Sequence, residues 1–428
     1  MDGRSGHAAN ASSAPLTGPL TGLRVIDFTH VLAGPACAYF LALLGAEVIK
    51  VESAGRGDAM RYRGGSDSAR AEAGMSTAYL TQAAGKKSIA LDLATPGGQE
   101  VMRRLIGSAD ILVENHRPET LTALGLDESF LRVLNPRLIH CAMTGYGRKG
   151  NLENAPAYDV NIQAACGLMT LTGTAESGPL RTGAPIMDYG TALAAGFAIT
   201  AALHQRDRTG QGTFVDVSML ETAFTLMSST ITDFFTTGTA PTPRGNAANS
   251  RSPGAGNFHC KEGTLSLGVN EEHQFRALAR VLGCEAWLSD PRFADRRARK
   301  AHGTALENEL AAALLTRTAA DWEQRMLDNG VPAARLRSLP ESLELEQTAA
   351  RRYLHHDRET GLTLPTLPFR IGDTAAHVPA SAPPSLGENS AEVLNMLGYT
   401  ATEIEALKAA GAVTWPQAEA KGLKALQR

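Results

Sequence analysis

The sequence lacks the short motifs that mark several large enzyme classes. It has no Gly-x-Ser-x-Gly nucleophile elbow, no phosphate-binding P-loop and no His-Glu-x-x-His pair. Only five of its 428 residues are cysteines, and none forms a Cys-x-x-Cys pair. These absences argue against the common hydrolases, ATPases and zinc proteases. The cysteine usage fits a reducing, cytoplasmic location.

Excess charge and long apolar runs are also scarce. The net charge is -3, and such a small negative charge does not favour binding to nucleic acid or to a membrane surface. No run approaches the roughly 18 apolar residues that a membrane span requires. Residues 1–21 are rich in Ala, Ser, Gly and Pro without the apolar core of a signal peptide, so we expect a disordered leader there.

Short apolar strands alternate with helices through the first half of the chain. We expect strands at 23–28, 47–52, 88–93, 110–114, 138–143 and 213–218, and helices at 35–44, 97–106, 191–206 and 220–235. This alternation predicts an α/β fold with a parallel, doubly wound sheet. Ligands of such sheets bind at the carboxyl ends of the strands.

The composition changes after this region. Residues 236–257 are full of Gly, Pro, Asn and Ser, which indicates a linker or loop. A strand at 263–269 and helices near 272–282 and 306–317 then predict a smaller second domain that ends near Val331-Pro332. Further helices are expected at 390–397 and 402–409.

Glycines and basic residues near the strand ends suggest ligand contacts. Gly145–Gly150 matches Gly-x-Gly-x-x-Gly, but Asn151–Pro156 resists the helix that a dinucleotide site needs, which favours a surface turn. The small residues of Thr29–Cys37 would let a ligand approach backbone amides at a helix start, although a plain tight turn fits equally well. Lys86, Lys87, Arg117 and Arg148 are the candidates to hold phosphates.

Asp188 differs from the other acidic residues. In Gly183–Gly190 an apolar, strand-like run leads into it, and a helix of small residues follows. A carboxylate at a helix start lies in the positive end of the helix dipole, which favours its ionised form. Such an aspartate can serve as a nucleophile or as a plain helix cap, and the residues alone leave both roles open.

Several segments, in their order and spacing, resemble the class III CoA-transferases (CaiB/BaiF type), the family of formyl-CoA transferase. The resemblance runs from about residue 20 to the C-terminus and rests on Gly22–Cys37, Gly45–Glu52, Gly57-Asp58, Lys86–Asp92, Val113–Asn115, Gly145–Gly147, Asp188, Thr209–Gly212, Val215–Ser218, Gly330–Pro332 and Pro383–Glu388.

The resemblance implies a fold and an assembly. The family combines a Rossmann-like large domain, built from both chain ends, with a smaller α+β domain between them. Two such chains interlock as a homodimer. On this chain, residues 22–225 and 333–428 would form the large domain, and 226–332 the small domain with its linkers.

The resemblance also implies a reaction, the transfer of CoA from an acyl-CoA donor to a small carboxylate acceptor. The aspartate that matches Asp188 attacks the thioester, forming a mixed anhydride and then an aspartyl-CoA thioester. Exchange of CoA between carboxylates is nearly neutral in energy, so neither a metal nor a permanently bound cofactor is required. A carboxylate nucleophile divides the exchange into equivalent acyl-transfer steps.

Contacts with CoA and with the acyl group carry over by position. The CoA contacts are His30, Val31, Ala33, Leu91, Asn115, His116 and Met219, and the acyl-pocket candidates are Leu32, Tyr158, Asp159 and Arg251. Relative to formyl-CoA transferase, Ser53 replaces an arginine and Leu32 a glutamine. The glycine run that closes over the aspartate is replaced by Asn249–Gly254, which disfavours formate and oxalate as substrates. Arg251 could pair with the far carboxylate of a dicarboxylate such as succinate.

Two other functions stay open at this stage. The α-methylacyl-CoA racemases of the same superfamily resemble this chain around Ala157–Gln163, with a histidine before the aspartate. Here that position is Tyr158, a poor base at neutral pH, so transfer is favoured over a racemase that uses Asp188 and Asp159. A non-catalytic CoA-binding protein is the third hypothesis, and an intact Asp188 argues against it.

Overall fold

The computed structural model describes residues 18–248, 250, 252–372 and 377–415. The chain forms two compact units. The larger contains the described residues up to Cys166, Gly183–Thr232 and those from Arg351 onward, and the smaller contains Gly167–Thr182 and Asp233–Ala350. The larger unit therefore draws on segments from both halves of the sequence.

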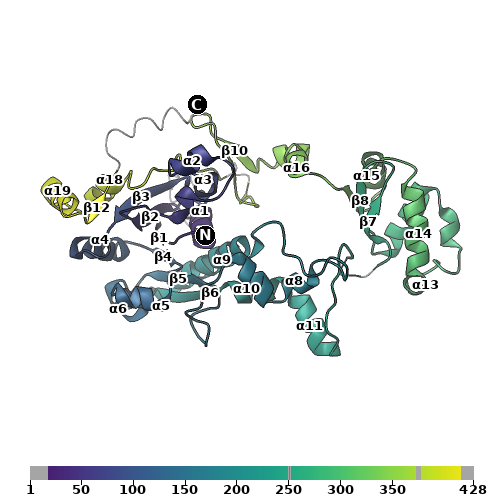
Figure 1. The fold of residues 1–428 in the computed structure, drawn as a ribbon, viewed down its shortest axis with the longest axis horizontal. Coiled ribbons are helices and arrows are strands. Elements are labelled where there is room, and N and C mark those ends of the chain that lie inside the picture. The colour runs from purple at the N-terminus through teal and green to yellow at the C-terminus, as the bar shows by residue number, and fades with distance from the viewer. Residues whose placement is uncertain (1–17, 249, 251, 373–376, 416–428) are drawn as a thin grey trace, which may run out of the picture. The chain divides into compact units, whose positions relative to one another are not determined.

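A seven-stranded sheet forms the centre of the larger unit (Figure 1). Its strands are β1 (Arg24–Phe28), β2 (Glu47–Ser53), β3 (Lys86–Leu91), β4 (Ile111–Glu114), β5 (Ile139–Thr144), β6 (Thr213–Ser218) and β12 (Val413–Thr414). They pair in the order β12-β3-β2-β1-β4-β5-β6, and all pairs are parallel except that of β12 with β3. The parallel α/β sheet expected from the sequence is confirmed.

Helices cover both faces of this sheet, because successive strand residues point to opposite sides. One core layer holds Val25, Val48 and Ile111 with residues of α1 (Ala33–Leu43) and α9 (Ile186–Thr209). The other holds Ile26, Ile49 and Leu112 with residues of α4 (Pro96–Gly107), α5 (Pro118–Ala123), α6 (Glu128–Leu134), α18 (Ser390–Met396) and α19 (Ala401–Ala409). The near-continuous apolar strands are thus buried on both sides.

The strand order reverses between β1 and β4. From β1 the chain builds β2 and β3 on one side, then returns to place β4 on the other side of β1. A crevice opens at such a point beyond the carboxyl ends of the strands, and ligands of open parallel sheets bind there. The residues that follow Phe28 and Glu114 border this crevice.

The remaining elements of the larger unit are short. They are the 3₁₀ turn η1 (Ala59–Tyr62), α2 (Ser68–Glu72), α3 (Thr77–Ala83), α7 (Asp159–Ala165), α10 (Met219–Leu226), β10 (Leu354–His356) and β11 (Thr363–Pro365). The single helix expected over 220–235 is interrupted at Met227, after which α11 (Ser228–Thr237) begins.

The smaller unit has its own core. Three antiparallel strands, β7 (Ala255–His259), β8 (Thr264–Gly268) and β9 (Ala333–Arg335), pair in that order. Its helical elements are α8 (Leu168–Leu171), α12 (Glu272–Leu282), η2 (Glu285–Leu288), α13 (Arg296–Ala301), α14 (Gly303–Leu314), α15 (Ala319–Asp328), α16 (Leu339–Leu343) and α17 (Glu346–Ala350). Phe275, Phe293 and Trp322 are buried among the leucines of α14.

Contrary to the expectation from the sequence, one helix of the described residues, α9, is long and apolar enough, by length and composition, to cross a membrane. Ala192, Ala195 and Ile199 on one side of it are fully buried in the core layer that it shares with α1. The core helix of a globular protein meets the same criterion of length and composition.

Candidate active site

A cavity of about 380 Å³ lies at the point where the strand order reverses. Its wall combines the loop after β1, the residues after β4, the start of α9 and the start of α10. Nine of the residues transferred by the resemblance line it together: His30, Val31, Leu32, Ala33, Asn115, His116, Tyr158, Asp188 and Met219. Arg117, Thr120 and Glu153 also line it.

Leu91 lines a second, adjoining cavity of about 470 Å³ at the ends of β2 and β3. Ser53 lies in the same wall, and His30 and His116 belong to both cavities. The two histidines therefore stand where the cavities meet, and an elongated ligand could extend past them from Leu91 to Asp188.

The two imidazoles form a pair. Their ring centroids are 5.2 Å apart, and His116 also contacts Phe28 at 4.1 Å. Burial lowers the pKa of His30, and burial together with repulsion from His30 lowers that of His116 to about 4. Neutral rings near pH 7 offer a ligand stacking and hydrogen bonds rather than positive charge.

Asn115 joins the ends of β1 and β4. The backbone N–H of His30 donates to Asn115 Oδ1 at 2.9 Å, and Asn115 Nδ2 donates to the backbone oxygen of His30 at 2.8 Å. A side-chain amide can satisfy one donor and one acceptor at once, which here fixes the backbone of His30. Asn115, which we expect to bind CoA, thus also holds the loop after β1 in place.

The segment before Asp188 is not a strand, contrary to the sequence prediction. Helix α9 begins at Ile186, five residues before the predicted start, and Asp188 is the third residue of its first turn. The Ile186 N–H bonds to the oxygen of Ala184, so the chain turns into the helix immediately after Pro185. Asp188 nevertheless lies at the positive end of the helix dipole, as expected.

Asp188 is half-buried and has an unusual acidity. Contrary to the expectation that the helix dipole holds Asp188 ionised, burial, followed by the nearby charge of Asp159, raises the pKa of its carboxyl to about 7. A carboxyl with this pKa is partly ionised near neutral pH, and its carboxylate is more basic and more nucleophilic than an exposed aspartate.

Asp159 has both carboxylate oxygens engaged. Its Oδ2 accepts the backbone N–H of Met187 at 2.7 Å, and its Oδ1 accepts Gln163 Nε2 at 2.6 Å. The residue therefore caps α9 from a neighbouring helix, a role usually played by the residue before a helix. This dedicated role explains why α9 starts without a side-chain cap of its own.

Tyr158, which precedes Asp159, is 61% exposed at the cavity wall. Its backbone N–H donates to Asn161 Oδ1 at 3.1 Å at the start of α7. The tyrosine side chain thus occupies the place where a racemase would carry its histidine.

Of the four basic candidates for phosphate contacts, only Arg117 lines the cavity. Lys86 is fully buried and pairs with Asp27, and Lys87 pairs with Glu47 and Glu392. Arg148 pairs with Glu114, a fully buried carboxylate. The prediction of Lys86 as a phosphate contact is therefore wrong, because its ammonium group is buried in an ion pair with Asp27.

The glycine-rich stretch after β5 forms bends and turns, and no helix begins within it. Gly147 and Gly150 have positive φ angles of 87° and 105°. This is the surface turn favoured from the sequence, and it lacks the helix N-terminus that a dinucleotide site requires.

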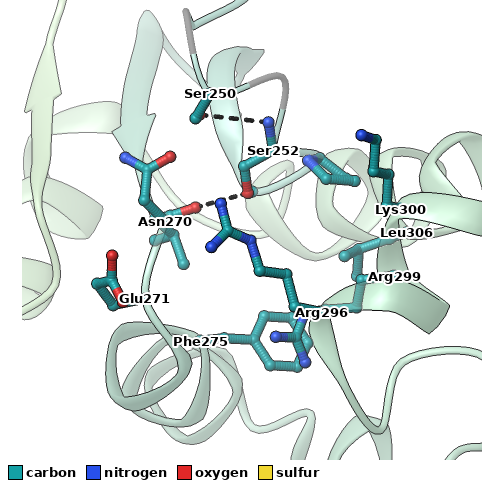
Figure 2. Close-up of a pocket in the computed structure, with 12 residues that line it drawn as sticks. Ser250, Ser252, Asn270, Glu271, Phe275, Arg296, Arg299, Lys300 and Leu306 are labelled. Carbon is teal, nitrogen blue, oxygen red and sulfur yellow. Dashed lines mark hydrogen bonds between the residues drawn. The ribbon is translucent and has the colours of Figure 1, made fainter.

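Arg251 lies outside the described residues, so its predicted contact with a substrate carboxylate stays a prediction. Its neighbours Ser250 and Ser252 line a cavity of about 230 Å³ in the smaller unit (Figure 2). Arg296, Arg299 and Lys300 of α13 line the same cavity, and Arg299 is engaged by Glu272. The described part of this loop therefore has a cationic environment.

Sequence reasoning missed the buried charges behind the cavity. Asp27 and Lys50 lie within apolar strands, and both are almost completely buried. Lys50 Nζ pairs with Asp58 Oδ2 at 3.0 Å. A charged residue inside an otherwise apolar strand was the available signal, since such a residue must find a partner in the interior.

Comparison with known proteins gives a consistent result. The model of CoA-transferase family III matches residues 20–390. The chain is 34% identical to a succinate–glutarate CoA-transferase of Agrobacterium fabrum over 88% of this chain and 95% of that protein. It is 35% identical to an acetyl-CoA:oxalate CoA-transferase of Acetobacter aceti, covering 83% of this chain and 89% of that protein.

A solved structure is also similar. A CaiB/BaiF family protein from Brucella suis superimposes with a TM-score of 0.78 at 30% identity, covering 89% of this chain and 99% of that one. The resemblance stated from the sequence is thereby confirmed, and CoA thioesters are the substrates of this class of enzyme. The chain belongs to CoA-transferase family III and is a CoA-transferase.

Proposed function

We propose that this enzyme moves CoA from an acyl-CoA donor to a carboxylate acceptor through covalent intermediates on Asp188. The observation that supports this most is the placement of Asp188. Its nucleophilic carboxylate lies in the first turn of α9 and shares one cavity with the loop His30–Ala33 and with Asn115. That cavity occupies the ligand-binding crevice of the sheet.

In the first half of the reaction, the donor's acyl group on CoA is replaced by the aspartyl group of Asp188. The Asp188 carboxylate attacks the thioester carbonyl, and the C–S bond of the tetrahedral adduct breaks. CoA leaves as a thiolate, and the acyl group remains on Asp188 as a mixed anhydride. The thiolate then attacks the aspartyl carbonyl, which expels the donor carboxylate and leaves an aspartyl-CoA thioester. The N–H groups of Ala33 and Gly34 at the start of α1, which have no acceptor within the helix, would stabilise the oxyanions.

The second half runs the same steps in reverse order with the acceptor. Its carboxylate attacks the aspartyl thioester and expels CoA thiolate, which gives a new anhydride. The thiolate then attacks the acceptor carbonyl, and the Asp188 carboxylate is released. No group other than the two substrates and Asp188 changes its bonds, so the cycle needs no permanently bound cofactor.

The CoA would run from the cavity at Leu91, past His30 and His116, to Asp188. Arg117 in the cavity wall is half exposed, lies 3.5 Å from Glu119 and can still meet a phosphate from solvent. We further propose that the enzyme works as a homodimer in the cytoplasm, built from a Rossmann-like large domain and a small α+β domain as in its family. Succinyl-CoA and acetyl-CoA, each assayed with a panel of mono- and dicarboxylates, would define donor and acceptor.

The test is to replace the nucleophile and trap the adduct. Asp188→Asn should abolish exchange and the adduct that hydroxylamine or borohydride captures with the native enzyme. Glu153→Gln is the matched control, because Glu153 is a second carboxylate in the same cavity wall. Exchange retained by Asp188→Asn would exclude the covalent mechanism.

The racemase alternative has less support. Both oxygens of Asp159 are engaged in hydrogen bonds, and a tyrosine precedes it. A racemase would exchange the α-proton of an acyl-CoA for deuterium in deuterated water, without any acceptor acid. We expect no such exchange.

A further inference from the structure

The loop that faces Asp188 contains a strained residue. Val31 has a φ angle of 71°, in the left-handed region that β-branched residues rarely adopt. Among the described residues, only Arg352 is another non-glycine residue with positive φ. Val31 lines the cavity of Asp188 and is followed, after Leu32, by the start of α1.

Side chains of β1 and β2, and one that follows β4, hold the two residues before Val31. Asp27 accepts the N–H of Thr29 at 3.2 Å and also its hydroxyl. Lys50 Nζ donates to the backbone oxygen of Thr29 at 2.9 Å. Asn115 then holds both the N–H and the oxygen of His30.

Asp58 holds Val31 itself. Its Oδ1 accepts the N–H of Val31 at 3.3 Å and that of Met60 at 2.9 Å, and its Oδ2 pairs with Lys50 at 3.0 Å. Five consecutive backbone groups, from the N–H of Thr29 to that of Val31, therefore have side-chain partners. A turn restrained at every polar group can keep a strained conformation.

Asp58 is itself fixed in place. Its own N–H donates to Glu52 Oε2 at 3.0 Å, and its side chain is 2% exposed. Gly57 before it has a φ angle of 70°, and a Cβ there would lie 2.7 Å from Glu52 Oε2. The Gly57-Asp58 pair, which the proposed reaction does not use, thus connects a rigid buried network to the turn.

We propose that Asp58, supported by Lys50, is a positioning residue that holds Val31 in its strained conformation and so aims the first amides of α1 at the reacting carbonyl. This inference rests on the proposed function. A relaxed Val31 would rotate the start of α1, and a displacement of about 1 Å at reacting groups can lower a rate by roughly 100-fold. Asp58 lines the second cavity with Leu91 and is absent from the wall of the Asp188 cavity, so it acts on the reacting groups through the loop.

The test is a double-mutant cycle between Asp58 and Val31. D58A should lower kcat by about 10–100-fold, while KM for the acyl-CoA changes by less than about threefold, because the loss falls on the transition state. In the V31G background the same D58A change should lower kcat by less than about threefold. Glycine adopts positive φ without strain, so the turn no longer depends on its anchor.

The controls separate positioning from loss of stability. R206M removes a buried arginine that pairs with Asp110 at 3.0 Å in the same unit, outside the network of Glu52, Asp58 and Lys50, and should lower Tm without lowering kcat by more than about threefold. The pair D58A/K50M avoids a buried unpaired charge and replaces D58A in the cycle if the single variant does not fold. V31G alone should raise Tm through relief of strain.

Three results would overturn the proposal. These are an unchanged kcat in D58A, a kcat loss of equal size in the native and V31G backgrounds, and a lower Tm in V31G. Failure of the covalent mechanism is seen separately, as exchange retained by Asp188→Asn. The cycle between Asp58 and Val31 can then still be measured on that activity.

Discussion

Asp159 accepts a hydrogen bond from the backbone N–H of Met187 at 2.7 Å, one residue before Asp188. One carboxylate thus caps the helix that carries the other and raises its pKa, in addition to the effect of burial. The two acidic residues have different environments and different roles, although they lie at the same helix start. This division suggests experiments on each of them.

Exchange activity should rise with pH around neutrality. Because the pKa of Asp188 is about 7, the nucleophilic carboxylate is mostly protonated at pH 6 and mostly ionised at pH 8. We expect kcat/KM for the acyl-CoA to show an acidic limb with an apparent pKa near 7. A flat profile between pH 5 and 8 would contradict this assignment.

Asp188→Asn should stabilise the protein at alkaline pH. A carboxyl whose folded pKa lies above its unfolded value favours the folded state fully only below about pH 4, and that stabilisation is lost as the pH rises to about 7. Ionisation of the buried Asp188 destabilises the native protein, and asparagine does not ionise. The gain in Tm of the variant over the native protein should therefore be larger at pH 8 than at pH 5. Thermal melts of both proteins at the two pH values would measure it, and an equal gain would refute it.

Asp159→Asn should shift the acidic limb of the pH profile to lower pH. The amide keeps an acceptor for Met187, and Gln163 can turn its own amide to suit, so the cap survives. The negative charge that raises the pKa of Asp188 is gone, while burial, the larger cause, remains. The apparent pKa should therefore fall but stay above that of an exposed aspartate. Asp233→Asn, at an exposed carboxylate of α11, provides a comparison.

Asn115→Ala should weaken binding of the acyl-CoA. Both hydrogen bonds to the backbone of His30 disappear, which frees the ring where the two cavities meet. We expect KM to rise by roughly tenfold, equivalent to about 1.4 kcal/mol. Asn329→Ala, an exposed asparagine of the smaller unit, is the control. An unchanged KM would mean that the bridge between β1 and β4 does not serve ligand binding.

Arg61→Met should destabilise the larger unit. Arg61 is 1% exposed and forms a bidentate pair with Glu52, with two N···O distances of 2.7 Å. Burial alone would raise the pKa of Glu52, but the hydrogen bonds and charge of Arg61 outweigh it and lower the pKa. Removing one partner of such a pair costs about 3–5 kcal/mol. Denaturant unfolding would measure the loss, and a change below about 1 kcal/mol would contradict it.

The sequence predicted the sheet more reliably than the start of α9. The strand expected over 213–218 coincides with β6, because period and composition agree there. The strand-like run before Asp188 was misread because the signal for the helix start lies far away in the sequence. The cap of α9 is Asp159, and the sequence pattern around Asp188 cannot reveal a partner that lies elsewhere in the chain.

The site shows the same limit. Nine residues transferred by resemblance line one cavity, since the order of motifs follows the order of strand ends. The strain at Val31 and its anchor Asp58 could not be read from sequence, because a φ angle depends on contacts that only the folded chain assembles. A buried charge in an apolar strand, such as that of Lys50, indicates from the sequence that an oppositely charged partner exists. It does not indicate which residue that partner is.

Strand β12 has a consequence for synthesis of the chain. It pairs with β3, and Thr414 Oγ1 donates to the oxygen of Ala54 across a separation of 360 residues. Leu91 of β3 precedes its partner Val413 by 322 residues, so at roughly 5–20 residues per second the edge of β3 stays unpaired for about 16–64 s during synthesis. During that interval the nascent sheet exposes an unpaired edge beside the second cavity, so the newly made enzyme passes through a period of vulnerability to aggregation before it can work.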